Sequence, residues 1–263
     1  MADTAVSLAR LRPDTGEIPW HRLLGMELKK VVDTVAWRIL LGFIVGMSLA
    51  GLVGVEAMGI ANGLIAVSMV LLALVSVGMP MIGLFTMTSE WDTRSIMMTF
   101  LIEPRRWRVV VAKAAAALLV AAVVLIVVAV ATLAISFAIS AVRGDSRLMS
   151  EIVESFRYGW LYQIVSETCA LGLALTLLGI AWGSLLLSTP ISMVAVAGVA
   201  LMPAMAITEV FDETMALWFG QMAPVLWLTG EEPFGPWVIT SVNLWCLAPL
   251  VGGFWRQSRR EVR

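Results

Sequence analysis

The stretch Ser89–Lys113 reads SEWDTRSIMMTFLIEPRRWRVVVAK and interrupts an otherwise apolar part of the chain. Its charged residues are Glu90, Asp92, Arg94, Glu103, Arg105, Arg106, Arg108 and Lys113. No charged residue occurs in the run 57–88 before it or in the run 114–142 after it. Charge-free runs longer than about 18 residues are typical of transmembrane helices. The stretch therefore predicts a short polar connection between two membrane spans.

Composition supports a membrane protein. Of the 263 residues, 60% are hydrophobic and 14% are charged, and the mean hydropathy is +0.91. Soluble domains usually carry about 25% charged residues. Only helices and closed barrels satisfy their backbone hydrogen bonds in lipid, and the alternating pattern of a barrel strand is absent here. We therefore expect an all-α membrane protein.

The apolar runs predict a single domain, 37–255, with six spans. Pro80 is expected to kink the second span. The long apolar run after residue 159 is expected to break at Leu187–Pro190, because Ser or Thr can cap a helix and Pro suits its first turn. The predicted spans are 37–55, 64–87, 109–141, 161–187, 191–208 and 238–255.

The ends of the chain are polar. Residues 1–17 are predicted to be a mobile cytoplasmic segment, and 256–263 a basic cytoplasmic tail. Residues 18–36 predict an amphipathic helix, with Trp20, Leu24 and Leu28 on one face, lying in the membrane interface. The alternative is an ordinary cytoplasmic extension of the first span.

Positive charge fixes the expected topology. With six spans, 15 of the 18 Lys and Arg residues lie on one side, and only Arg143, Arg147 and Arg157 lie on the other. The positive-inside rule then places both termini in the cytoplasm. A seventh span at 214–230 would put the arginine-rich tail outside. We therefore expect segment 209–237 to form external re-entrant or surface helices between spans five and six.

The sequence lacks the motifs of common catalytic sites. It contains no P-loop, no HExxH and no GxSxG motif, and its single histidine, His21, lies in the amphipathic helix. Glu167 is the one ionisable residue predicted within a span, as a substrate or proton contact or as a headgroup-level carboxylate. We expect no enzyme, no metal site and no cofactor in this chain, so energy for any transport must come from a partner.

The charged stretch could receive that energy. A short cytoplasmic helix between spans two and three, opened by Glu90, Asp92 and Arg94 and ended by Pro104, could seat in a groove of a partner. Met97, Met98, Phe100 and Leu101 would supply its apolar contacts. The alternative is a solvated loop with positive anchors.

The same stretch resembles the ABC-2-type permeases, the membrane subunits of ATP-binding-cassette exporters. Those proteins typically carry Glu, then Gly-Thr four residues on, an apolar run, Pro-Arg-Arg or Pro-Ser-Arg, and Ala-Lys opening the third span. The matching residues here are Glu90, Arg94-Ser95, the run 96–102, Pro104-Arg105-Arg106 and Ala112-Lys113. Arg94 departs from the usual glycine. Glu27 and Lys30 in the amphipathic helix also resemble the family pattern.

The resemblance implies a transporter in the cytoplasmic (inner) membrane of a prokaryote. Such a permease pairs with a second copy or a related permease, as homodimer or heterodimer, and with two ATPase subunits that bind ATP and Mg. Membrane lipid is a further partner, and nucleic acid is not. The implied ATPase-coupling residues are Glu27, Lys30, Glu90, Asp92, Arg94, Pro104, Arg105 and Arg106. The candidate substrate-path residues are Met79, Phe85, Glu167, Met193 and Met202.

The expected function is therefore ATP-driven efflux of an amphipathic compound, a lipid or a peptide. Two alternatives remain. One is a non-transporting membrane anchor or immunity-type subunit that recruits the same ATPase. The other is an intramembrane enzyme, which would require paired ionisable residues at membrane depth.

Overall fold

The structure is a computed structural model that describes residues 18–58, 64–143, 150, 153–154, 157–200 and 235–259. The secondary structure of these residues is helical, which confirms the predicted all-α class. The helices are α2 (Trp20–Asp33), α3 (Val35–Met58), α4 (Leu64–Asp92), α5 (Ile96–Ile102), α6 (Arg106–Arg143), α8 (Trp160–Leu186), α9 (Thr189–Ala200), α13 (Pro236–Val242), the π-helical turn η1 (Asn243–Leu247) and α14 (Ala248–Arg259).

Within the described ranges, three helical segments are long and apolar enough to cross a membrane: Arg106–Ala131, Ser166–Leu186 and Pro236–Gln257. A chain with three such segments reads as a membrane protein. The predicted amphipathic segment 18–36 contains α2. Residues 1–17, 201–234 and 260–263 lie outside the described part, and with them lie Met202, most of the predicted external segment and the last residues of the tail.

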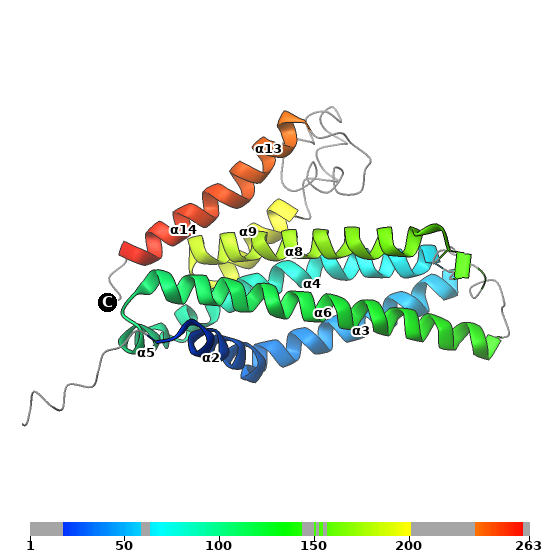
Figure 1. Ribbon diagram of the computed structural model, residues 1–263, viewed down its shortest axis with the longest axis horizontal. Helices are drawn as coiled ribbons and strands as arrows, with labels where there is room; N and C mark the ends of the chain where they lie inside the picture. The colour runs from blue at the N-terminus through cyan, green and yellow to red at the C-terminus, as the bar shows by residue number, and fades with distance from the viewer. Residues whose placement is uncertain are drawn as a thin grey trace, which may run out of the picture.

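Helices α3, α4, α6 and α8 run side by side and form the bundle (Figure 1). Their shared core is apolar and receives residues from all four helices, including Ile44, Ile82, Ala121 and Leu178. Helices α13 and α14 are inclined to the bundle, and α14 packs on α8. Helices α2 and α5 lie at one end of the bundle, near the end of α14 (Figure 1).

Small residues allow α4 and α8 to approach closely. A Cβ added to Gly179 would overlap the carbonyl oxygen of Pro80, and one added to Gly83 would overlap the carbonyl oxygen of Thr176. Close backbone approach at small residues is the usual way in which membrane helices gain packing energy. Pro80 is a buried residue inside α4, and its carbonyl oxygen forms part of this contact.

The long apolar run breaks where the sequence predicts it. Helix α8 ends at Leu186, and Leu187 adopts the left-handed conformation with φ 58° while its N–H donates to the carbonyl of Gly183. Helix α9 then begins at Thr189, with Pro190 in its first turn. A residue in this conformation is a common helix stop.

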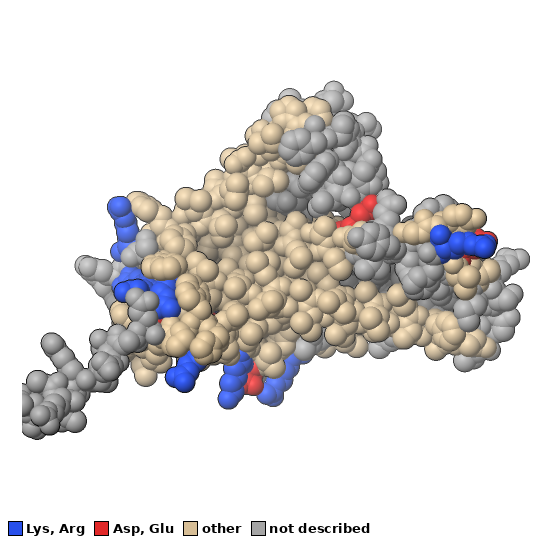
Figure 2. Space-filling model, in the orientation of Figure 1, with Lys and Arg blue, Asp and Glu red and all other residues tan. Residues whose placement is uncertain are grey.

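Charge is distributed unevenly over the surface. Lys and Arg side chains gather at the end that carries α2 and α5, and uncharged surface occupies the middle of the bundle (Figure 2). Exposed cations of this end include Arg22, Lys29, Arg94 and Arg105. The molecule therefore has one strongly basic end beside an apolar belt.

Candidate functional site

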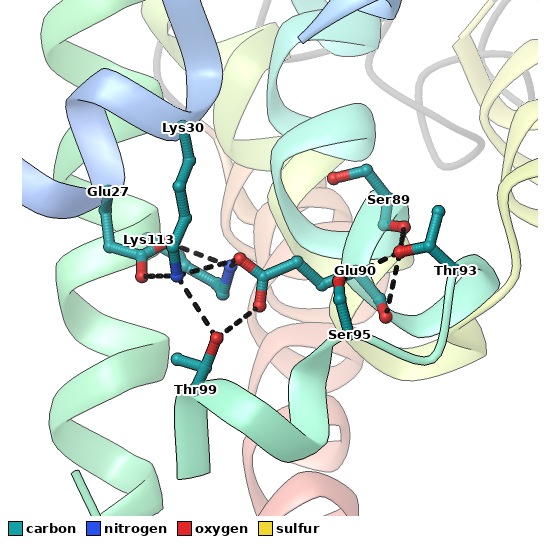
Figure 3. Close-up of polar contacts among 8 residues, drawn as sticks. All are labelled: Glu27, Lys30, Ser89, Glu90, Thr93, Ser95, Thr99 and Lys113. Carbon is teal, nitrogen blue, oxygen red and sulfur yellow. Dashed lines mark hydrogen bonds and ion pairs between the residues drawn. The ribbon is translucent and has the colours of Figure 1, made fainter. Parts of the chain in front are cut away.

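Four charged side chains meet at the basic end: Glu27, Lys30, Glu90 and Lys113, called here the four-charge network (Figure 3). The ammonium of Lys113 lies 2.9 Å from Glu27 Oε2 and 2.8 Å from Glu90 Oε1. The ammonium of Lys30 lies 2.7 Å from Glu27 Oε1 and 3.0 Å from Glu90 Oε1. Each carboxylate therefore bridges both lysines.

Three helices supply these side chains. Glu27 and Lys30 stand one turn apart on α2, Glu90 lies in the last turn of α4, and Lys113 lies in the second turn of α6. A fourth helix joins through Thr99 of α5, whose hydroxyl donates to Glu90 Oε2 and accepts from Lys30 Nζ. The network thus ties α5 to the helices around it.

The network is buried on the Lys113 side and open on the Lys30 side. Side-chain exposure is 2% for Glu27 and 4% for Lys113, but 41% for Lys30. Burying charge is costly unless it is paired and hydrogen-bonded. Two carboxylates facing two ammonium groups meet that condition.

The pKa values of two members shift accordingly. Burial tends to raise the pKa of Glu90, but the nearby Lys113 and Lys30 ammonium groups outweigh it and hold the pKa below its usual 4.5. Burial tends to lower the pKa of Lys30, but Glu27 and Glu90 outweigh it and raise the pKa above 10.5. Both shifts favour the charged forms.

A second ion pair anchors the start of α6. The guanidinium of Arg108 donates to Glu103 Oε2 at 3.1 Å and to the carbonyl of Ile18 at 2.6 Å. It also lies 5.1 Å from the ring centroid of Trp20, which in turn packs against Trp107. The beginning of the amphipathic helix is thereby held against α6.

Helix α5 shows an apolar face to the outside. Ile96 and Thr99 are buried, whereas Met97, Met98, Leu101 and Ile102 are exposed by 45%, 67%, 79% and 62%. The aromatic residue of this helix, Phe100, packs edge-on against Trp91 and lies under the Arg106 guanidinium. An apolar ridge bordered by arginines is a surface suited to a protein partner.

The turn before α5 differs from the prediction. Glu90 and Asp92 belong to the last turns of α4 and do not open the short helix. The chain reverses at Arg94, whose φ is +57°. This left-handed conformation interrupts helical hydrogen bonding, so α5 begins only at Ile96.

Asp92 has a structural partner across the bundle. Its carboxylate accepts from the backbone N–H of Thr189 at 3.2 Å, and the Thr88 and Thr189 hydroxyls lie 2.6 Å apart. A carboxylate at a helix N-terminus satisfies a free donor and complements the helix dipole. The end of α4 is thus tied to the start of α9.

The predicted coupling residues therefore separate into two groups. Glu27, Lys30 and Glu90 belong with Lys113 to the four-charge network, whereas Arg94, Pro104 and Arg105 are exposed along the chain around α5. Asp92 binds the start of α9, and Arg106 lies over Phe100. Among the predicted path residues, Phe85 lines a cavity beside α2, and Met79 is packed in the bundle core. Glu167 is half-buried on α8, and Met193 is exposed on α9.

Sequence reasoning did not select Lys113, Thr99, Glu103 or Arg108 as site residues. Lys113 carried a usable signal, since it is a lone cation at the start of a long charge-free run. Thr99 carried none, because a hydroxyl within an apolar heptapeptide has no distinctive pattern. Within the described residues, no group of three or more His, Cys, Asp and Glu side chains could hold a metal ion.

Comparisons with known proteins gave no match to a protein-family model, to a curated protein or to a solved structure.

Proposed function

We propose that this chain is the permease subunit of an ATP-binding-cassette exporter of the ABC-2 type, in which six spans place both termini in the cytoplasm. The observation that carries the proposal is the apolar ridge of α5. It lies at the basic end of the molecule, where Thr99 of α5 hydrogen-bonds to Glu90 and Lys30. Ion pairs join these two residues to Glu27 and Lys113, and so to α2 and α6. A separate ATPase, with its ATP and Mg, would dock on this ridge.

The energetics of α5 favour a docked state. Met98, Leu101 and Ile102 expose most of their apolar surface at the polar end of the protein. Contiguous exposed apolar surface commonly marks a site of association. A partner that covers these side chains would gain hydrophobic free energy of about 25 cal/mol for each Å² removed from water.

The four-charge network gives α5 mechanical contact with the bundle. Glu90 accepts from Thr99 of α5 and pairs with Lys113 of α6. A displacement of α5 would therefore move charges that also hold α2 and α4. Because an uncompensated buried charge is costly, these helices are expected to move together.

The geometry at Arg94 also supports the family resemblance. ABC-2-type permeases usually carry glycine at the matching position. Here that position adopts φ +57°, which glycine accommodates without steric cost. The family pattern and the backbone conformation therefore agree, although the residue differs.

The proposal is tested by copurification of ATPase activity with the tagged chain from membranes of its source cell. The double substitution Met98→Asp and Leu101→Asp should lower the copurified activity by roughly tenfold or more, because central apolar anchors dominate interface energies. The control is Val153→Asp, which places an aspartate on an apolar residue that is 59% exposed and precedes α8 in the chain. Equal activity in the α5 variant and the control would refute docking through α5.

A non-transporting anchor that recruits the same ATPase is the second candidate, since the apolar ridge of α5 fits it equally. Reconstitution separates the two. A permease should move amphipathic compounds across proteoliposomes in an ATP-dependent way, and its ATPase should be stimulated by them. An anchor should bind the ATPase without either effect.

A further inference from the structure

A cavity of about 630 Å³ lies between α2, α3, α4 and α5. Its inner walls are apolar and include Trp37, Leu40, Ile82 and Phe85. The four-charge network forms a polar boundary, and Ser and Thr hydroxyls, such as those of Thr34 and Ser95, add further polar lining. The volume falls in the range of about 300–1,000 Å³ that is usual for ligand pockets. Apolar walls with a polar side suit an amphipathic molecule.

The network itself has little capacity left for a ligand. Both oxygens of Glu27 and both of Glu90 are engaged, and the Lys30 ammonium already faces Glu27, Glu90 and Thr99. The charges of its two carboxylates and two ammonium groups also cancel. A ligand held by charge must therefore use other groups along the cavity.

Two exposed residues of α2 supply such groups. Lys29 and Asp33 line the cavity, stand one helical turn apart and have no ion-pair partner within the described part of the chain. Together they offer one positive and one negative charge, so the net charge of these two unpaired side chains along the cavity is zero. This complements a ligand that carries both signs close together, and it does not complement a net anion.

The location of the cavity indicates that this ligand comes from the membrane. Helix α2, at the charged end, leads directly into α3 of the apolar bundle (Figure 1). Residues of both helices line the cavity, so it lies where the chain passes from the charged end into the bundle. A phospholipid in the same layer would reach both the charges and the apolar walls. Its phosphate would face Lys29 through a charge-assisted hydrogen bond, and its ammonium would face Asp33.

We propose that this cavity binds one zwitterionic phospholipid of the surrounding membrane, with its phosphate at Lys29, its ammonium group at Asp33 and an acyl chain against Trp37, Leu40 and Phe85. The inference needs only a membrane location and does not depend on the proposed transport function.

The test is native mass spectrometry of the full-length chain. The protein is delipidated in detergent and then mixed with phosphatidylethanolamine, phosphatidylcholine or phosphatidylglycerol of identical acyl chains. The unaltered chain should retain one zwitterionic lipid roughly tenfold better than phosphatidylglycerol, the ratio expected for one charge-assisted contact. Lys29→Gln should lower retention of the zwitterionic lipids. Asp33→Asn should remove the discrimination against phosphatidylglycerol.

Arg22→Gln is the matched control, because Arg22 is also an exposed cation of α2 but does not line the cavity. Its lipid retention should equal that of the unaltered chain. The proposal is overturned by preference for phosphatidylglycerol, by unchanged retention in Lys29→Gln, by an equal loss in Arg22→Gln or by no retained lipid at all. ATPase copurification, measured on the same variants, reports separately on the proposed function.

Discussion

Arg94 is the residue whose conformation least suits its side chain. Its φ of +57° places a Cβ in the left-handed region, which costs an L-residue about 1–2 kcal/mol relative to a right-handed turn. Thr93 and Ser95 on either side exchange a hydrogen bond between their hydroxyls at 2.9 Å, which helps to hold the turn. The sharp reversal between α4 and α5 is therefore kept at an energetic cost.

Replacing Arg94 with glycine should stabilise the protein. We expect a gain of about 0.5–1 kcal/mol, because glycine removes the steric cost but loses more entropy on folding. The measurement is the thermal unfolding midpoint in detergent. Arg94→Ala is the control, since alanine removes the guanidinium and keeps the strained Cβ. A rise of equal size in both variants would show that charge, and not backbone conformation, limits stability here.

At the scale of elements, the four-charge network joins helices that are distant in sequence. Its contribution depends on pH through Glu90. The pKa of this carboxyl is lower in the folded protein than its ordinary 4.5, so its stabilisation is fully present above pH 4.5 and is lost as pH falls through the folded pKa. Lys30 behaves oppositely: its raised pKa gives stabilisation that is fully present below pH 10.5 and is lost as pH rises through the higher pKa of the folded protein.

Glu90→Gln should therefore destabilise the protein in a pH-dependent way. At neutral pH we expect a loss of about 3 kcal/mol, because Lys113 keeps only one of its two carboxylates in a buried position. The difference from the unaltered chain should shrink as pH falls below 4.5, and it should disappear once pH has fallen through the lower pKa of folded Glu90, where this carboxyl becomes neutral. Unfolding midpoints measured across this range check the expectation. Glu154→Gln, which neutralises an exposed carboxylate, should leave them unchanged; a gap that persists in acid would contradict the linkage.

The sequence predicts these elements unequally well. Long charge-free runs mark the helix interiors, and the Leu187–Pro190 break follows from capping chemistry. Helix ends are harder to predict. The third span was predicted to begin at Val109, but α6 begins at Arg106, so the charged residues just before Val109 belong to the helix. The start of α5 was predicted too early, since no glycine or proline marks the turn at Arg94. The sequence predicted Glu27, Lys30 and Glu90 of the four-charge network but not Lys113, because the pairing of Glu27 with Lys113 depends on tertiary packing.

At the scale of the whole molecule, charge asymmetry predicts orientation. The basic end carries α2, α5 and the end of α14, whereas the start of α8 lies toward the other end of the bundle (Figure 1, Figure 2). The positive-inside rule predicts that the basic end faces the cytoplasm. The proposed six spans then require Ser95 and Arg259 to lie on the same side of the membrane.

Cysteine labelling tests this arrangement directly. In a background with Cys169 and Cys246 replaced by Ala, single cysteines are introduced as Ser95→Cys, Val153→Cys and Arg259→Cys, all at exposed positions. A membrane-impermeant maleimide added to intact cells should label only Val153→Cys, and permeabilised cells should label all three. External labelling of Ser95→Cys would reverse the orientation inferred from charge. External labelling of Arg259→Cys as well as Val153→Cys, with Ser95→Cys still protected, would require an odd number of crossings after α5, and the segment around 214–230 would then be a span.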